Sequence, residues 1–306
     1  MKPIVRIAAA VALLLTPGWL PPAEANQVKA FVSIPPQKYF VQKIGGDLVE
    51  ISVLVPPGSD PHTYEPKPRQ MADLAKTDLF FAVGIDFEKA WMNKIATANP
   101  GMRIVQTDAD IEKIALAEHH HHDQKGHTHT HSHKKAAHGH DHAGAPDPHV
   151  WLSPPLVKIQ ARHIADGLAA VDSANRTRYE ENLAGFMKEI DALDAELKAL
   201  FAGNRGARFM VFHPSWGYFA QAYGLEQVPI EIEGKDPKPA QLKDLIHHAR
   251  EQGIKVIFVQ PQFSAKSAEM VAREIAGQVV AADPLAENWA ENLRAVGRKV
   301  KAAFPQ

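Results

Sequence analysis

The 306-residue chain contains no cysteine. This absence excludes disulfides and thiolate ligands, so any metal site must use nitrogen and oxygen ligands. It also argues against lipid attachment, which exported lipoproteins make through a cysteine. Net charge is near zero, with 34 Lys and Arg against 35 Asp and Glu, and no basic stripe occurs. The composition therefore gives no reason to expect nucleic acid as a partner.

Long apolar runs are also missing after the first residues of the chain. A basic start with Lys2 and Arg6 precedes a short apolar stretch, and the pattern Ala23-Glu24-Ala25 is typical of a cleavage site. The apolar stretch is too short to cross a bilayer of about 30 Å. We therefore expect residues 1–25 to be a cleaved secretory signal peptide, and the mature protein to be soluble in the periplasm, without a lipid anchor.

Histidine, by contrast, is abundant in one internal segment. Of 17 histidines, eleven lie in HHHHDQKGHTHTHSHKKAAHGHDH, which has no apolar residue larger than alanine. Such a segment buries too little apolar surface to offset its ordering entropy, so we expect a disordered loop at 118–142. Because imidazole binds borderline divalent metals, we interpret these histidines as accessory, weak metal ligands. They are His119, His120, His121, His122, His127, His129, His131, His133, His138, His140 and His142.

The rest of the chain has two halves with the same order of elements. In each half, apolar runs typical of buried parallel strands, such as VEISVLV at 49–55 and IKVIFVQ at 254–260, alternate with helices. Between the halves, residues 175–202 carry apolar side chains at helical spacing, which predicts a helix of roughly 40 Å. We expect an α/β fold with two similar lobes, each a mostly parallel sheet flanked by helices, joined by one long rigid helix. The expected divisions are a signal peptide at 1–25, an N-terminal α/β lobe at 26–172 that contains the His-rich loop, a linking helix at 173–204 and a C-terminal α/β lobe at 205–306.

Four residues are candidates for a tight metal site because each follows a predicted strand. They are His62 in SDPHTYEP, His149 in PDPHVWLSP, His213 in FMVFHPSWGYF and Asp283 in VVAADPL. Ligands of open α/β sheets bind beyond the carboxyl ends of strands, and two candidates come from each half, so we expect a site between the lobes. Three imidazoles and one carboxylate suit four-coordinate Zn2+. A site filled by protein groups favours binding over catalysis, so we expect no enzyme.

Residues near these motifs are expected to have structural roles. Asp283 is the weaker ligand candidate, because Asp-Pro is also common in turns, and a water is the alternative fourth ligand. The acidic residues of IEIEGKDPKP, which are Glu231, Glu233 and Asp236, are expected to cap a helix or lie on the surface. Aromatic residues beside the candidates are expected to wall the cleft. They are Tyr64, Trp151 and Trp216.

Several longer segments carry a family resemblance: AFVSIPPQKYFVQKIGGD, VLVPPGSDPHTYEPKPRQ, DPHVWLSP, FHPSWGYFAQAYGL and ADPL. With the linking helix they cover nearly the whole mature chain. In these segments the chain resembles the cluster A-I, TroA-type solute-binding proteins, the periplasmic receptors of zinc and manganese ABC importers. The resemblance implies two lobes with metal bound between them, and it carries the family's ligands onto His62, His149, His213 and Asp283.

The resemblance also implies a cargo and partners. Manganese-type relatives typically have Glu at the position of His213, and His softens the site toward zinc. Pro61 stands where some zinc receptors have an acidic residue, which favours Asp283 as the fourth ligand. We therefore expect a monomeric receptor that delivers Zn2+ to a membrane permease and its ATPase, with a periplasmic zinc chaperone as a further partner.

Other functions remain open at this point. A receptor for manganese, iron or nickel would share the same fold. An exported metallochaperone or adhesin would need no transporter, although adhesins of the family are usually lipid-anchored. A zinc enzyme is disfavoured, because no H-E-x-x-H motif occurs and no Glu stands beside a ligand as a general base.

Deletion of residues 118–141 tests the role of the His-rich loop as a weak collector, sensor or buffer of metal. We expect the shortened protein to keep one tight zinc site and to lose several weak ones, because the tight ligands lie elsewhere in the chain. Zinc titration against a competing chelator measures both classes of site. Loss of the tight site on deletion would contradict this separation of roles.

Overall fold

The computed structural model describes residues 27–116, 145–232 and 234–304. The expected signal peptide at 1–25 and the His-rich loop at 118–142 lie outside these ranges. Within them, every helix is too short or too polar to cross a membrane.

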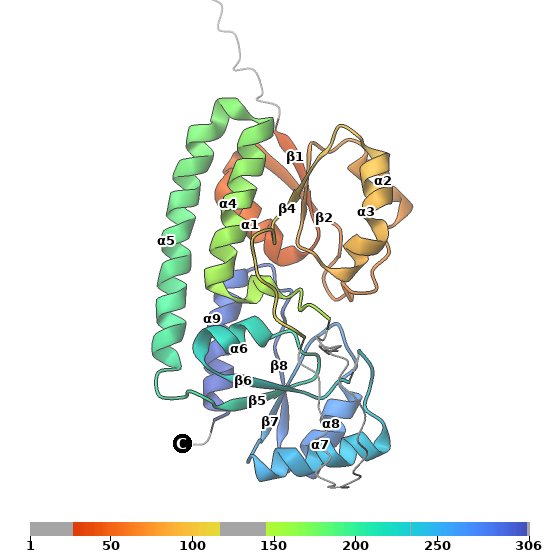
Figure 1. Cartoon of the computed structure of the whole chain (residues 1–306), viewed down its shortest axis with the longest axis vertical. Helices are drawn as coiled ribbons and strands as arrows, with labels where there is room; N and C mark the ends of the chain where they lie inside the picture. The colour runs from red at the N-terminus through yellow and green to blue at the C-terminus, as the bar shows by residue number, and fades with distance from the viewer. Residues whose placement is uncertain (1–26, 117–144, 233, 305–306) are drawn as a thin grey trace, which may run out of the picture.

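Two four-stranded parallel sheets form the centres of two lobes (Figure 1). The first has the order β2-β1-β3-β4 and the second the order β6-β5-β7-β8, so the two lobes repeat one topology. All strand pairs within each sheet are parallel. The strands are β1 (Val28–Val32), β2 (Val49–Val53), β3 (Leu79–Ala82), β4 (Arg103–Gln106), β5 (Arg208–Val211), β6 (Glu226–Pro229), β7 (Val256–Val259) and β8 (Gln278–Ala281).

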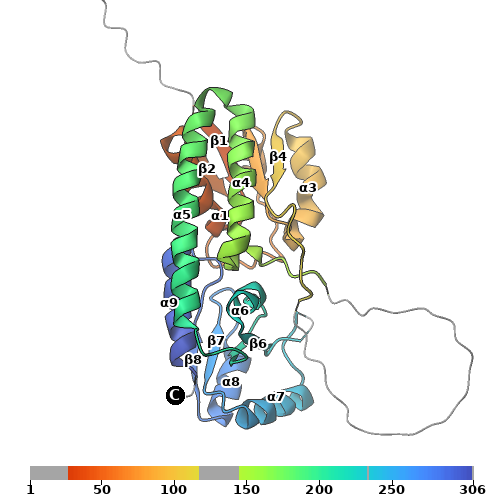
Figure 2. The same ribbon diagram turned by 60° about the vertical axis from the view of Figure 1, so that its left-hand side comes forward.

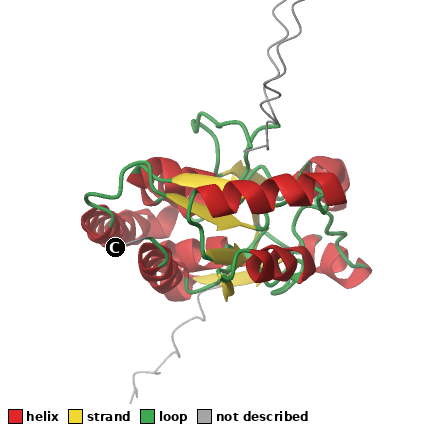
Figure 3. Ribbon diagram, turned by 90° about the horizontal axis from the view of Figure 1, so that it is seen from below, coloured by secondary structure: helices red, strands yellow, loops and turns green. Residues whose placement is uncertain are grey.

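Helices flank both sheets, as Figure 3 shows from below. The first lobe contains α1 (Pro35–Gly45), α2 (Pro68–Leu74), α3 (Asp86–Ala98) and α4 (Pro154–Val171), and the second contains α6 (Gly217–Tyr223), α7 (Pro239–Glu251), α8 (Lys266–Glu274) and α9 (Trp289–Ala302). Three 3-10 turns are η1 (Gly46–Leu48), η2 (Val150–Leu152) and η3 (Ser173–Asn175). Helices α1, α2, α4 and α7 begin with proline, which has no N–H to leave unpaired in a first turn.

The linking helix α5 (Arg176–Leu200) has 25 residues, which corresponds to a length of about 38 Å. It packs against α1 and α4 of the first lobe and against α9 of the second, so it spans both lobes (Figures 1 and 2). Its buried side chains recur at helical spacing and are Tyr179, Phe186, Ile190, Leu193 and Leu197. The two-lobe α/β fold with one long connecting helix is therefore confirmed. The boundaries at 26–172, 173–204 and 205–306 stay a prediction.

Buried aromatic contacts join the lobes beside α5. The ring of Trp289, at the start of α9, lies 5.1 Å from that of Phe40 in α1 and 6.5 Å from that of Phe186 in α5. Trp289 Nε1 donates a 2.6 Å hydrogen bond to the carbonyl of Trp151, and Trp151 Nε1 donates a 2.7 Å bond to the carbonyl of Pro284. One continuous apolar core thus runs from the first sheet through α5 into the second lobe. The relative position of the lobes is fixed by side-chain packing as well as by chain connection.

Substitution of one glycine in α4 and one in α5 tests how closely the helices of the first lobe are packed. A Cβ atom at Gly167 of α4 would lie 2.9 Å from Val105 Cγ2 and 3.0 Å from Phe81 Cε1, whereas one at Gly185 of α5 would meet nothing within 4 Å. We expect Gly167→Ala to destabilise the metal-free protein by about 1–2 kcal/mol, because overpacking exceeds the gain in helix propensity. Gly185→Ala should stabilise it by up to about 1 kcal/mol. Thermal unfolding midpoints compare the two, and equal shifts would contradict the packing described for α4.

Candidate metal centre

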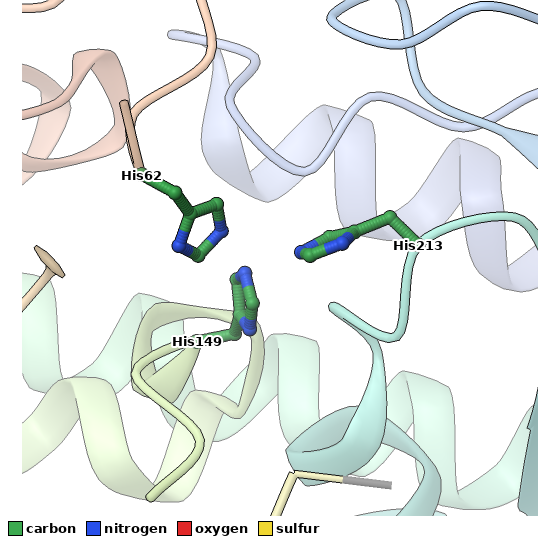
Figure 4. A group of neighbouring side chains, drawn as sticks. All are labelled: His62, His149 and His213. Carbon is green, nitrogen blue, oxygen red and sulfur yellow. The ribbon is translucent and has the colours of Figure 1, made fainter. Parts of the chain in front are cut away.

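Three of the four predicted ligands meet between the lobes (Figure 4). His62 lies in the loop between β2 and α2, His149 directly precedes η2, and His213 follows β5. The centroids of the three rings are 5.0–5.3 Å apart, and one nitrogen of each ring lies within 4.8 Å of the other two. We call this group the three-histidine site. Two segments come from the first lobe and one from the second, as the sequence predicts for a site between lobes.

Each imidazole of the three-histidine site is hydrogen-bonded to its own carboxylate through Nδ1. The distances are 2.9 Å from His62 to Asp86, 2.7 Å from His149 to Asp147 and 2.6 Å from His213 to Glu231. A carboxylate only accepts hydrogen bonds, so the proton of a neutral ring lies on Nδ1 and the lone pair on Nε2. This pairing fixes ring orientation and raises the basicity of the ligand nitrogen, as it does in metal sites generally.

The site is largely shielded from water. His149 and His213 are 2% and 6% exposed, and the side chain of His62 is 17% exposed. His213 Nε2 is buried without a hydrogen-bond partner among the described residues, an arrangement that is costly unless a cation or a donor occupies the space beside it. A cavity of about 10 Å³ adjoins the three rings, which is about the space of one ion or water. Three imidazoles with one nitrogen each in mutual reach fit a borderline divalent metal.

Burial keeps His149 in its metal-binding form, and a hydrogen bond keeps Asp86 ionised. Burial lowers the pKa of the His149 imidazole to about 4, although the nearby Asp147 carboxylate opposes this shift. The ring is therefore neutral at pH 7. A hydrogen bond from His62 holds the pKa of the Asp86 carboxyl well below its usual range, so Asp86 is ionised and accepts the Nδ1 proton.

A repeated turn sets the backbone of the site. In Asp60-Pro61-His62, the carboxylate of the Asp accepts a 2.9 Å hydrogen bond from the backbone N–H of the His two residues later. Asp147-Pro148-His149 contains the same 2.9 Å bond, and so does Asp283-Pro284-Leu285. We call these the three Asp-Pro turns. In each turn, Asp and Pro together restrict the backbone. His62 and His149 are therefore positioned by their immediate neighbours in sequence.

Asp283 lies close to the site but outside the group of three histidines. Pro284 and Leu285 line the cavity, which places this Asp-Pro turn beside the rings. Asp283 Oδ1 accepts hydrogen bonds from Leu285 N–H and from Gln262 Nε2, each 2.9 Å long. Asp283 is not among the residues whose ligand atoms lie within 4.8 Å of one another. Its role as the fourth ligand stays a prediction.

Two expectations about the surroundings were wrong. Glu231 was expected on the surface, but it is 7% exposed and binds His213, because the chain turns inward after β6. His149 was expected to follow a strand. Among the described residues, the chain just before it forms an isolated β-bridge, between Pro146 and Ala115. The histidine is positioned instead by its Asp-Pro turn and by η2.

The expected aromatic wall is only partly present. Trp151 lines the cavity with its ring 5.2 Å from that of His149. Tyr64 and Trp216 are not among the lining residues; Tyr64 packs on Phe87 and Trp216 on Phe219. The wall beside His213 is Phe263, whose ring stacks on the imidazole at 4.7 Å.

Reasoning from the sequence missed the carboxylates that hold the histidines. Asp147 stands two residues before His149 in the same motif, which is a local signal. Asp86 and Glu231 stand just beyond β3 and β6, so their signal is only the position of an acidic residue at the carboxyl end of a strand. Neither is near its histidine in the sequence.

The pKa of His149 predicts how the stability of the metal-free protein depends on pH. The folded-state value of about 4 lies below the ordinary 6.5, so the unfolded chain binds the proton more tightly. The contribution of neutral His149 to the free energy of unfolding is fully present above about pH 6.5 and is lost as the pH falls toward 4. The melting temperature of the wild type minus that of His149→Gln should therefore rise from pH 4 to 6.5 and be constant above pH 7.

The difference in melting temperature between the wild type and His149→Gln isolates the contribution of His149. Burial raises the pKa of Glu88 to about 7, and this group acts in the opposite direction over a similar range, but it is present in both proteins and cancels. A difference that does not change between pH 4 and 7 would contradict a buried, neutral His149.

Comparisons with known proteins cover the segments that carry the site. The family model described as zinc-uptake complex component A, periplasmic, matches residues 31–303. High-affinity zinc uptake system protein ZnuA of Paracoccus denitrificans (strain Pd 1222) is 35% identical over 303 residues, 90% of this chain and 92% of that protein. Manganese ABC transporter substrate-binding lipoprotein PsaA of Streptococcus pneumoniae is 28% identical over 246 residues, 76% of this chain and 72% of that protein. A solved structure described as the crystal structure of ZnuA matches with a TM-score of 0.81 at 43% identity, over 92% of this chain and all of that one.

Proposed function

The chain belongs to the family of the periplasmic zinc-uptake component A, and on this premise we propose that it is the receptor that binds Zn2+ and delivers it to the permease of an ABC importer. The family is that of the substrate-binding proteins of ABC transporters, which are not enzymes. The observation that carries the proposal is the three-histidine site, in which every imidazole has its Nδ1 on a carboxylate and one nitrogen within 4.8 Å of a nitrogen of each other ring.

The donor set supports zinc as the cargo. His62, His149 and His213 provide three nitrogen ligands, and an oxygen of Asp283 or of a water is the candidate for the fourth position. Imidazole suits zinc, whereas manganese prefers a larger share of oxygen ligands. The relative from Paracoccus is named as a zinc uptake protein, in agreement with this choice.

The partners and location follow from the family and the sequence. The family implies a membrane permease with its ATPase as the partner that receives the metal. We propose that the protein acts as a monomer in the periplasm after cleavage of residues 1–25, without a lipid anchor, and that an exported zinc chaperone can load it. The proposed units are the lobes at 26–172 and 205–306 and the linking helix at 173–204. The eleven histidines of 119–142 add weak accessory sites.

Manganese is the second candidate cargo, because a relative from Streptococcus pneumoniae is named as a manganese transporter component. The fold and the receptor role would be unchanged. The residue that distinguishes the two cargoes is His213. Its imidazole makes the site rich in nitrogen, whereas a carboxylate there would supply the oxygen ligand that manganese prefers.

Metal competition on the mature protein tests the cargo. We expect one tight Zn2+ per chain that excess Mn2+ does not displace. Replacing His213 by Glu should lower the preference for zinc over manganese by about tenfold or more, because a nitrogen ligand becomes an oxygen ligand. Glu231→Gln is combined with this change, since two buried carboxylates would otherwise face each other.

Equilibrium dialysis with both metals, read by elemental analysis, measures the preference. Glu231→Gln alone is the matched control for the double variant. A wild-type site that Mn2+ empties readily would support manganese as the cargo. A preference unchanged by His213→Glu would contradict the assignment of His213 as a ligand.

A further inference from the structure

Gln262 is a polar residue in the wall of the three-histidine site that has no role so far. It follows β7 and lines the same cavity as His62, His149 and His213. Its amide nitrogen Nε2 donates a 2.9 Å hydrogen bond to Asp283 Oδ1. Its amide oxygen Oε1 is buried and has no hydrogen-bond partner among the described residues.

The orientation of this amide is fixed by chemistry. A carboxylate oxygen only accepts hydrogen bonds, so the amide end that faces Asp283 must be the NH2 group. The same Oδ1 atom accepts the backbone N–H of Leu285, and Asp283 lies outside the group whose ligand atoms are within 4.8 Å of one another. The acceptor Oε1 is thereby presented away from Asp283, and a buried acceptor without a donor is unfavourable.

The groups around the cavity offer acceptors and few donors. The three imidazoles have their Nδ1 protons bound by Asp86, Asp147 and Glu231, which leaves lone pairs on Nε2. A metal ion bound by three imidazoles needs a fourth ligand. A metal-bound water is such a ligand, and it has O–H groups to donate.

We propose that Gln262 positions the fourth ligand of the bound metal. Its Oε1 accepts a hydrogen bond from the water that completes the coordination of the divalent cation, and Asp283 acts through Gln262 by holding the amide in this orientation. The inference rests on the proposed function of the site as a metal receptor, and it gives Asp283 a role as a positioning residue. The fourth position is then neutral and exchangeable.

Two single substitutions distinguish this arrangement from direct ligation by Asp283. Gln262→Leu removes the acceptor and replaces the amide by an apolar side chain of similar size. Asp283→Asn keeps an oxygen that accepts from both Leu285 N–H and Gln262 Nε2. It removes the negative charge that a directly ligating Asp283 would bring to the metal. Gln252→Leu is the matched control, since Gln252 is an exposed glutamine at the end of α7 in the same lobe.

The experiment uses the full mature protein, with Zn2+ affinity measured by chelator competition and Co2+ as a spectroscopic probe. We expect Gln262→Leu to weaken zinc binding by about tenfold, the lower end of effects seen for residues that act on a metal through its ligands. Asp283→Asn should change the affinity by less than about threefold, because both hydrogen bonds are kept. The visible absorption of bound Co2+ should change in Gln262→Leu and stay constant in Gln252→Leu.

Direct ligation by Asp283 predicts the opposite order. Asp283→Asn would then lose most of the affinity and alter the Co2+ spectrum, while Gln262→Leu would bind zinc as tightly as the wild type, or more tightly because the carboxylate is released. That order, or no effect of either substitution, overturns the inference while leaving the receptor function intact. A wild type that binds no zinc overturns both. If Gln262→Leu does not fold, as judged by thermal unfolding, Gln262→Met provides the same test.

Discussion

The metal site depends on the pairing of each imidazole with its own carboxylate. Each pairing uses one ring nitrogen and leaves the lone pair of the other directed toward a common point. His213 Nε2 is buried without a partner among the described residues, which is unfavourable unless a cation or a donor lies beside it, so the surrounding fold must hold the ring in place. It does so from independent elements, because Asp86 begins α3 and Glu231 follows β6. The strand ends of two sheets therefore have to face one another.

The packing between the lobes bears on the geometry of the same site. His62 and His149 belong to the first lobe and His213 to the second, so any shift between lobes changes the distances among the three rings. The long helix α5 and the buried contacts of Trp289 with Phe40 and with the Trp151 carbonyl resist such a shift. Pre-organised ligands lose little freedom on binding a metal, which favours tight binding of a small ion by rigid parts.

The sequence contains enough information for the fold class and for the histidines, but not for their partners. Strand and helix patterns are local, and so are the Asp-Pro-His motifs at His62 and His149. The contacts of His62 with Asp86 and of His213 with Glu231 span 24 and 18 residues, and only the sheet topology brings them together. Glu231 was expected on the surface because its acidic neighbours are typical of an exposed loop. The position of Asp283 depends on a hydrogen bond to Gln262, which no pattern indicates.

The third Asp-Pro turn ends in a leucine where the other two end in a histidine. Asp283-Pro284-Leu285 has the same backbone hydrogen bond as the two Asp-Pro-His turns, and Leu285 lines the cavity. The backbone is therefore already shaped for a further histidine, and one aliphatic side chain takes its place. The apolar leucine in the wall means that the described residues around the cavity offer three imidazoles and not four.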